Sequence, residues 1–238
     1  MTEPKKIAYF VTGTDTDVGK TLVSAALIQC FADQELRVIG MKPVAAGCYQ
    51  LGDQLMSDDV AQLILASNIV APIHHVNPYA FSQAIAPSIA ADIAGIEIRM
   101  EVIEQAYAQL VKEADVVIVE GVGGFCVPLS AHFDTADLAQ KLALPVILVV
   151  GMRLGCLNHA LLTAEAIKTR GLKLAGWIAN QPNSEMVAFD ENFQILNQRL
   201  QAPCLGILDW MDRADFKDGF VERVARQLRL EKLGVLKV

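Results

Sequence analysis

The chain has 238 residues, a length that fits one large domain or two small ones. Its 20 Lys and Arg against 27 Asp and Glu give a net charge of −7, and hydrophobic residues make up 53% of it. Such an acidic chain lacks the clustered cations that nucleic acid or an anionic membrane surface requires, so neither is expected as a partner. The aliphatic composition argues against disorder and favours a buried parallel sheet.

The cysteines and the apolar runs both bear on the cellular location of the protein. The five cysteines are scattered, odd in number and form no CxxC pair, which predicts free thiols in a reducing environment. The longest apolar run, residues 145–150, is far shorter than the ~20 residues of a membrane helix. The first residues lack the long apolar stretch of a leader. We therefore expect a soluble, cytoplasmic protein.

Short β-branched runs alternate with helical patterns along the chain. Strands are predicted at residues 7–12, 37–41, 116–120, 146–150, 174–179 and 204–208. Helical spacing links Ile98 to Leu110 and Phe189 to Leu200, and Asn158 is expected to cap a helix that ends near Gly171. Strands alternating with helices indicate parallel βαβ units. The predicted fold class is α/β, a doubly wound, mostly parallel sheet with helices on both faces, in one domain over residues 1–238.

The exit of the first predicted strand carries a phosphate-loop pattern. Gly19, Lys20 and Thr21 open a helix there, as at the end of a Walker A loop. In such loops backbone N–H groups and the helix N-terminus hold phosphates, the lysine reaches the β/γ oxygens, and the hydroxyl binds Mg²⁺. The start departs from the pattern, because Thr14 stands where the first glycine belongs and Gly13 lies one residue early. ATP and Mg²⁺ are the predicted cofactors.

Further strand exits carry residues suited to phosphoryl transfer. Lys42 follows the second predicted strand, and with Lys20 it can surround a γ-phosphate with positive charge. Glu120 ends an apolar strand, where a lone carboxylate is costly unless it is paired or liganded. The candidate magnesium ligands are Thr21, Glu120 and an acid from residues 53–59.

Several segments together resemble the dethiobiotin synthetase family. They are residues 12–21 (TGTDTDVGKT), 42–45 (KPVA), 77–79 (NPY), 119–124 (VEGVGG), 155–160 (GCLNHA) and 175–180 (AGWIAN). The resemblance runs from about residue 7 to about residue 211. It implies a homodimeric P-loop ligase of biotin biosynthesis that converts 7,8-diaminopelargonic acid, CO₂ and MgATP to dethiobiotin, ADP and phosphate. The implied path passes through a carbamate and a carbamic-phosphoric anhydride.

The resemblance also implies roles for particular residues. Lys42 and Lys20 are the implied catalytic residues, and the family's metal-binding aspartate falls on Asp59, next to Asp58, so that Thr21, Asp59 and Glu120 would hold the metal. The implied nucleotide contacts are Asp17, Val18, Gly19, Lys20, Thr21, Leu22, Asp59, Glu120, Gly121, Val122, Gly123, Asn180, Gln181, Asp209, Trp210 and Met211. The implied substrate contacts are Ala46, Gly123, Gly151, Leu154, Gly155 and Asn158, with residues 151–158 reaching the partner subunit's site.

The sequence departs from the family pattern near the diamine side. Ala46 stands where the family commonly has Ser or Thr, Asp17 where it usually has Glu, and Asp209 where it usually has Pro. Residues 84–88 read AIAPS, where the family often has Pro-x-Ser-Pro-His. A weaker affinity or an altered substrate stays open on these grounds.

Two other readings compete with the ligase. A regulatory ATPase of the MinD and ParA type would carry a second lysine at position 15, where this chain has Asp15. A P-loop synthetase acting on a different acid substrate, such as a cobyric acid, generally carries an added glutaminase domain, for which 238 residues leave no room. Both features favour the ligase.

Overall fold

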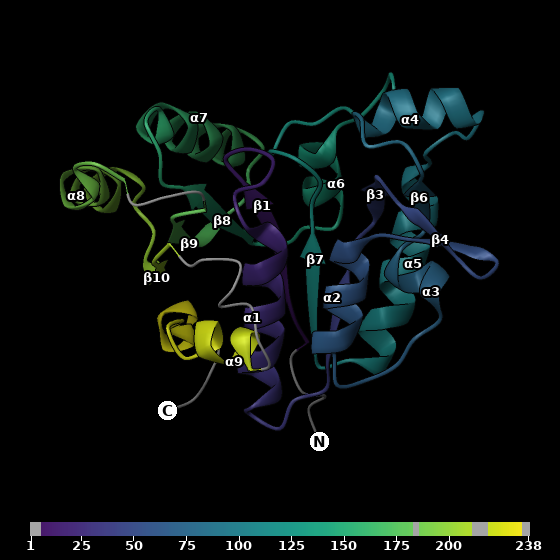
Figure 1. Cartoon of the computed structure of the whole chain (residues 1–238), viewed down its shortest axis with the longest axis horizontal. Coiled ribbons are helices and arrows are strands. Elements are labelled where there is room, and N and C mark those ends of the chain that lie inside the picture. The colour runs from purple at the N-terminus through teal and green to yellow at the C-terminus, as the bar shows by residue number, and fades with distance from the viewer. Residues whose placement is uncertain (1–5, 183–185, 211–218, 235–238) are drawn as a thin grey trace.

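A six-stranded sheet forms the centre of the computed structural model, which describes residues 6–182, 186–210 and 219–234 (Figure 1). Its strand order is β10-β9-β8-β1-β7-β2, and every neighbouring pair runs parallel. The strands are β1 (Ile7–Gly13), β2 (Val38–Met41), β7 (Val116–Glu120), β8 (Val146–Gly151), β9 (Leu174–Asn180) and β10 (Cys204–Leu208). All six were predicted, with bounds that differ by at most one residue, and the α/β fold class is confirmed.

Helices cover both faces of this sheet (Figure 1). They are α1 (Lys20–Ala32), α2 (Asp58–Ala66), α3 (Ile73–Val76), α4 (Pro87–Ala94), α5 (Met100–Glu113), α6 (Thr135–Lys141), α7 (Cys156–Thr169), α8 (Phe189–Arg199) and α9 (Phe220–Ala225), with a 3₁₀ turn at Leu230–Leu233. Helices α1 and α9 pack on one face, and α5, α6, α7 and α8 on the other. Among the described residues, no helix is both long and apolar enough to cross a bilayer.

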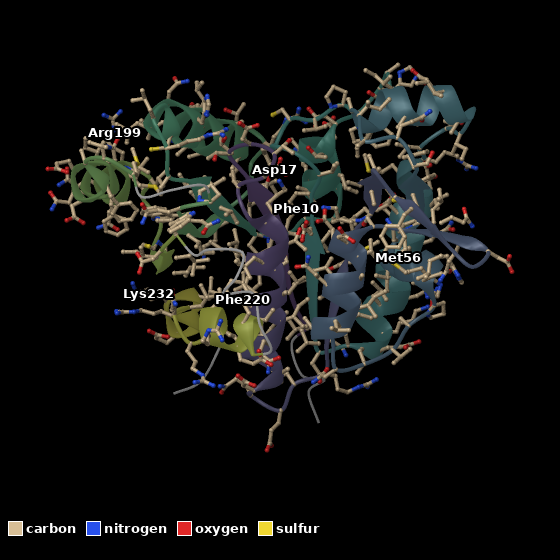
Figure 2. The ribbon with its side chains drawn as sticks, viewed as in Figure 1. Phe10, Asp17, Met56, Arg199, Phe220 and Lys232 are labelled. Atoms are coloured by element: carbon tan, nitrogen blue, oxygen red, sulfur yellow. The ribbon has the colours of Figure 1, made fainter. Side chains whose placement is uncertain are left out.

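The central strand β1 shows why the sheet is apolar on both sides. Tyr9 and Val11 pack with Phe31 of α1, whereas Phe10 points into the opposite cluster, which contains Ile103 of α5. Phe10 is fully buried and lies near the middle of the molecule, while Phe220 of α9 lies beside α1 (Figure 2). Because side chains of both parities are buried, the strands read as continuous apolar runs rather than alternating ones.

Two details correct the sequence-based expectations. The N-cap of α7 is Gly155, with φ 97°, and Asn158 lies inside the first turn, so the prediction that Asn158 caps this helix was wrong. The left-handed backbone that starts α7 there needs a glycine. Two further pairs of short strands were not predicted: β3 (Val44–Ala46) with β6 (Tyr79–Phe81), and the hairpin of β4 (Tyr49–Leu51) and β5 (Gln54–Met56). Strands of three residues are too short to show a period.

The five cysteines are unpaired in the structure. All five thiols are free: Cys30, Cys48, Cys126, Cys156 and Cys204.

Candidate nucleotide and magnesium site

The loop between β1 and α1 lies at the carboxyl edge of the sheet, where open parallel sheets bind ligands. Asp17 and Gly19 have left-handed backbones, with φ 57° and 89°, and Lys20 begins α1 directly after them. Figure 2 places Asp17 at this edge. A short run of alternating backbone conformations before a helix N-terminus presents successive N–H groups to an anion. The geometry agrees with the predicted phosphate loop despite its displaced first glycine.

Asn180, at the end of β9, braces this loop. Its Nδ2 donates a hydrogen bond of 2.8 Å to the carbonyl of Val18, which uses one of the two amide hydrogens. The contact brings the amide so close to Gly19 that a Cβ placed there would lie 2.3 Å from Asn180 Nδ2. Position 19 therefore requires glycine both for its φ and for the space beside it.

A Gly19→Ala substitution tests this brace. We expect its loss of unfolding free energy in urea to exceed that of Gly171→Ala by about 1–3 kcal/mol, the typical cost of overpacking. Gly171 is a matched control, because it has φ 71° and nothing within 4 Å of an added Cβ. Both variants pay the left-handed penalty, whereas Gly19→Ala alone displaces Asn180. Equal losses would contradict the brace.

Lys20 is buried inside the loop that it follows. Its side chain is 7% exposed, and Nζ donates to the carbonyl of Asp15 at 3.1 Å. Burial lowers the pKa of Lys20, and the positive charge of Lys42 lowers it further. An ammonium held by a backbone carbonyl gains Coulomb energy when an anion arrives. This placement suits a cation that binds phosphate.

Lys42, Asp59, Glu120 and Thr21 form a compact cluster next to the loop. Lys42 Nζ lies 2.6 Å from Asp59 Oδ2, 2.6 Å from Glu120 Oε1 and 3.2 Å from the carbonyl of Gly121. The hydroxyl oxygen of Thr21 lies 2.8 Å from Asp59 Oδ1 and 2.9 Å from Glu120 Oε1. A hydroxyl has one proton, so it satisfies one of these carboxylates at a time. The cluster thus joins the ends of β2 and β7 to the first turns of α1 and α2.

The charges in this cluster stabilise one another. Burial by itself lowers the pKa of Lys42, but the charges of Glu120 and Asp59 outweigh it and raise that pKa above its usual value. Desolvation raises the pKa of Asp59, while the neighbouring Lys42 charge outweighs it and lowers that pKa below its usual value. Lys42 and Asp59 therefore both stay ionised at neutral pH.

The oxygen set fits a small divalent cation. Glu120 is fully buried, and among the described residues no hydrogen-bond partner reaches its Oε2. Thr21, Asp59 and Glu120 provide hard oxygen donors, of the kind that Mg²⁺ prefers together with phosphate oxygens. A buried carboxylate oxygen with free lone pairs beside two further oxygens is the arrangement that such an ion would satisfy.

The geometry also separates the acids of residues 53–59. Asp59 meets Lys42 and Thr21, whereas Asp58 is exposed in the first turn of α2, behind its N-cap Ser57. Asp53 lies in the exposed turn between β4 and β5. The aspartate that faces the candidate phosphate loop is therefore Asp59.

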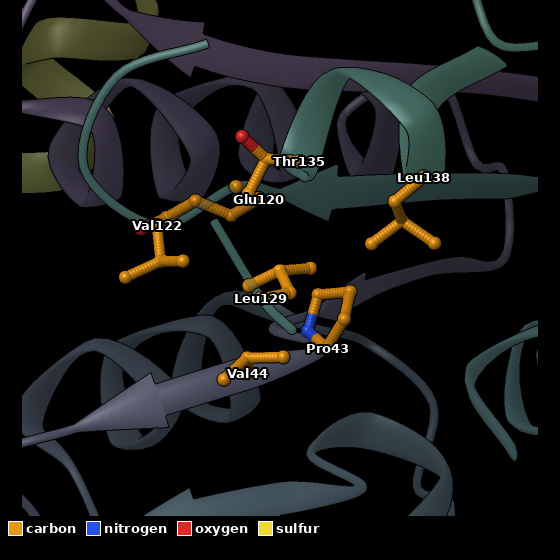
Figure 3. Close-up of a pocket in the computed structure, with 8 residues that line it drawn as sticks. Pro43, Val44, Glu120, Val122, Leu129, Thr135 and Leu138 are labelled. Atoms are coloured by element: carbon orange, nitrogen blue, oxygen red, sulfur yellow. The ribbon is translucent and has the colours of Figure 1, made fainter. Parts of the chain in front are cut away.

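A small cavity of about 10 Å³ borders Glu120. Its lining includes Pro43, Val44, Leu129 and Leu138, and Figure 3 shows these apolar side chains around the end of β7. The cavity is too small for ATP or a diamine and holds at most one water. Its apolar walls keep bulk solvent from this side of Glu120 and so strengthen the contact with Lys42. This cavity is therefore not a nucleotide site.

The predicted nucleotide contacts occupy several strand exits. Val18 is buried, Leu22 is half-buried in the first turn of α1, and Gly121, Val122 and Gly123 follow β7. Gly123 has φ 62°, and a Cβ there would lie 3.6 Å from Thr16 Oγ1, so this glycine loop lies against the phosphate loop.

The predicted base-side residues lie at the ends of β9 and β10. Gln181 is buried, and its Oε1 accepts a hydrogen bond of 2.8 Å from the backbone N–H of Met186. Asp209 and Trp210 are exposed and directly follow β10, the strand that pairs with β9, at whose end Asn180 lies. Met211 lies outside the described residues.

The predicted substrate contacts fall in two places. Ala46 ends β3 opposite Phe81 of β6, and it is half-buried. The remaining ones surround the start of α7: Gly151, Leu154, Gly155 and Asn158. Leu154 is 99% exposed. Ala46 and the residues at the start of α7 thus lie on different elements of the chain.

Sequence reasoning missed two positioning contacts. Asn77 is buried, and its Nδ2 donates to the carbonyls of Lys42 at 2.6 Å and Tyr79 at 3.0 Å, which fixes the backbone at Lys42. Arg153 forms an ion pair with Asp15 at the mouth of the phosphate loop. Asn77 belongs to the segment 77–79 that supports the family resemblance, but nothing in the sequence alone predicted its contact with Lys42.

The chain has the fold of a P-loop nucleoside triphosphatase. The features that define this class are the parallel sheet, the phosphate loop between β1 and α1, and the lysine and hydroxyl at the start of the helix. In agreement, residues 8–217 match the family model described as an AAA domain. The structure is similar to that of a ParA family ATPase from Chlorobium tepidum, with a TM-score of 0.58, 15% identity, and coverage of 98% of this chain and 97% of that one. At this identity the likeness concerns the fold alone.

Curated relatives identify the particular family. The chain is 56% identical to the ATP-dependent dethiobiotin synthetase BioD of Nitrosospira multiformis, over 88% of this chain and 91% of that protein. It is 50% identical to the protein of the same name from Aromatoleum aromaticum, over 97% of this chain and 99% of that protein. The chain belongs to the dethiobiotin synthetase family of ATP-dependent ligases, which confirms the resemblance found in the sequence.

Proposed function

We propose that this chain closes the ureido ring of dethiobiotin from 7,8-diaminopelargonic acid and CO₂, with conversion of ATP to ADP and phosphate. The observation that carries the proposal is the cluster in which Lys42 lies 2.6 Å from both Asp59 and Glu120, beside the phosphate loop. Family membership supports the reaction, and this cluster supports the place where it occurs.

The reaction needs three bond-forming steps. One amine of the diamine attacks CO₂ and loses a proton, giving a carbamate. A carbamate oxygen then attacks the γ-phosphorus of ATP, which forms the carbamic-phosphoric anhydride and releases ADP. The second amine attacks the carbamoyl carbon, the ring closes and phosphate leaves. The second step joins two anions, so the protein must place positive charge between them.

The two buried lysines supply that charge. Lys20 would bind the β- and γ-phosphate oxygens, since its ammonium already lies inside the phosphate loop. Lys42 would lie between the carbamate and the γ-phosphate, held on its other side by Asp59 and Glu120. Both remain fixed before substrate binds, so little reorganisation is needed during phosphoryl transfer.

The metal site would use Thr21, Asp59 and Glu120. Mg²⁺ bound there would neutralise charge on the phosphate oxygens. The protein's part is to orient the two carboxylates, and Lys42 does so through its contacts with both.

The nucleotide would lie along the strand exits. Residues 17–22 and 121–123 would contact phosphates through their backbone, and Asn180, Gln181, Asp209, Trp210 and Met211 would surround the base. An asparagine amide both donates and accepts hydrogen bonds, as a purine edge requires. The existing bond from Asn180 to Val18 would then connect base binding to the phosphate loop.

A second copy of the chain would complete the diamine site, with Ala46, Gly123, Gly151, Leu154, Gly155 and Asn158 as its contacts. The exposure of the loop before α7, where Leu154 is 99% exposed, supports a homodimer. Such a loop leaves its side chains accessible to another subunit. We further propose a single catalytic domain over residues 1–238 and a cytoplasmic location, for which the five free thiols are suited.

The test is ATP turnover with defined substrates. We expect phosphate release from MgATP to require both 7,8-diaminopelargonate and bicarbonate, and the organic product to have the mass of dethiobiotin. Phosphate release at the same rate without the diamine would contradict the proposal and favour a regulatory ATPase. Turnover with another diamine or acid in its place would mean that the substrate differs from that of the family. The departures at residues 46 and 84–88 would then be the first candidates for the cause.

A further inference from the structure

Asp15 places a negative charge at the mouth of the phosphate loop, and Arg153 meets it. Asp15 Oδ2 accepts a hydrogen bond from Arg153 Nη2, and Asp15 Oδ1 accepts one of 2.8 Å from the backbone N–H of Thr16. The two charged side chains are 45% and 44% exposed. An ion pair this exposed contributes little to folding stability. What the ion pair does change is the local charge, because Arg153 neutralises Asp15.

The sheet topology brings these residues together. Strands β1 and β8 are parallel neighbours, so the loops that leave their carboxyl ends lie side by side. The backbone N–H of Thr14 donates to the carbonyl of Val149 at 3.0 Å, and the N–H of Gly151 donates to Thr14 Oγ1 at 3.2 Å. Arg153 lies two residues beyond β8 and Asp15 two beyond β1. The ion pair thus joins two loops that these backbone hydrogen bonds already hold side by side.

The position of Asp15 makes its charge relevant to an anionic ligand. The backbone carbonyl of Asp15 accepts the hydrogen bond from Lys20 Nζ, at 3.1 Å. The carboxylate is therefore carried by the same loop residue whose backbone holds this lysine, and its charge lies at the mouth of the loop. An unneutralised carboxylate there would repel a polyphosphate and offset part of the attraction of Lys20.

We propose that Arg153 is a positioning residue that neutralises Asp15 and thereby permits tight binding of the ATP phosphates. It acts through Asp15 and does not itself contact the nucleotide. The inference rests on the proposed function only in taking the loop as the site of ATP. It explains how a loop with an aspartate at position 15 still accepts a highly charged anion.

A double-mutant cycle measured by MgATP binding tests the proposal. The proteins are the wild type, Arg153→Ala, Asp15→Asn and the double variant, titrated with MgATP in a calorimeter without diamine. Asn keeps the hydrogen bond to Thr16 and removes the charge. We expect Arg153→Ala to raise Kd about fivefold, the upper range for an exposed pair. The double variant should return to within about twofold of Asp15→Asn, since the repelling charge is gone.

Two further measurements separate this role from a structural one. Arg153→Lys should restore most of the affinity, and the penalty of Arg153→Ala should shrink at high salt, because charge repulsion is screened. With the diamine saturating, Arg153→Ala should raise KM for ATP. Arg99→Ala is the matched control, since it removes an exposed arginine paired with Glu101 at 4.0 Å, in the lead-in to α5. It should leave Kd unchanged.

Several results would overturn the inference. A double variant that binds as weakly as Arg153→Ala would mean that Arg153 acts on the nucleotide directly or through loop structure. An unchanged Kd for Arg153→Ala would mean that the pair has no role in binding. Failure of the proposed function is distinguishable, because it would appear as wild-type protein that binds MgATP but does not convert the diamine.

Discussion

Replacing Lys42 with alanine is expected to lower kcat for dethiobiotin formation by about 10³-fold or more. This is the usual effect of losing a cation or donor that stabilises charge in phosphoryl transfer. Lys42 is buried, and its Nζ lies 2.6 Å from both Asp59 and Glu120. Because the carbamate and the phosphate are both anions, no other arrangement of the cluster replaces an ammonium at this point. A variant that keeps kcat within about tenfold of the wild type would contradict the role.

The same substitution should destabilise the protein without its metal. Removing one partner of a buried ion pair costs about 3–5 kcal/mol, because the other charge is left unpaired. Since Asp59 is 43% exposed, we expect the lower end of that range. Mg²⁺ should recover part of the lost Tm, as it can lie between the same carboxylates. Lys141→Ala is the control: Lys141 is exposed and its half-buried partner Glu104 lies 3.6 Å away, so the expected loss is below about 1 kcal/mol.

Replacing Glu120 with glutamine should raise the Mg²⁺ concentration required for half-maximal activity by about 10- to 100-fold, the range typical of altered metal surroundings. Glutamine keeps the volume of Glu120 and an oxygen that accepts from Lys42, but it lacks the negative charge. The orphaned Oε2 of Glu120 is the lone-pair donor that the metal would use. Excess Mg²⁺ should therefore restore part of kcat/KM.

Controls for this variant come from the same chain. Asp59→Asn should act in the same direction, since Asp59 faces Thr21 and Lys42. Glu104→Gln alters an acid that pairs with Lys141 between α5 and α6, and it should leave the Mg²⁺ requirement unchanged. A Glu120→Gln protein with the wild-type Mg²⁺ requirement would show that the metal is held elsewhere.

Much of the fold could be predicted because the strands are buried on both faces. Runs such as residues 146–150 are apolar at every position, so their limits are visible in the sequence. Parallel strands then place their carboxyl ends at one edge, which brings Lys42 and Glu120 together without any knowledge of side-chain contacts. The cluster was predictable as far as this topology determines it.

The remaining contacts depend on packing that no local pattern records. Asp59 was selected over Asp58 by the family resemblance, and the geometry agrees because α2 turns Asp59 toward Thr21. The ion pair of Asp15 with Arg153 joins residues 138 apart in the chain. The prediction that Asn158 caps α7 was wrong because the helix begins after Gly155, whose left-handed backbone ends the preceding loop three residues before Asn158. Such details follow from tertiary structure.

The most direct test of the central claim is the fate of oxygen from CO₂. In a single turnover with freshly dissolved C¹⁸O₂, unlabelled MgATP and 7,8-diaminopelargonate, the phosphate released should carry one ¹⁸O, because the carbamate oxygen that attacks phosphorus leaves with it at ring closure. The ureido carbonyl should keep the other. Phosphate without label would mean that water attacks the γ-phosphorus, and it would contradict transfer to a carbamate held beside Lys42.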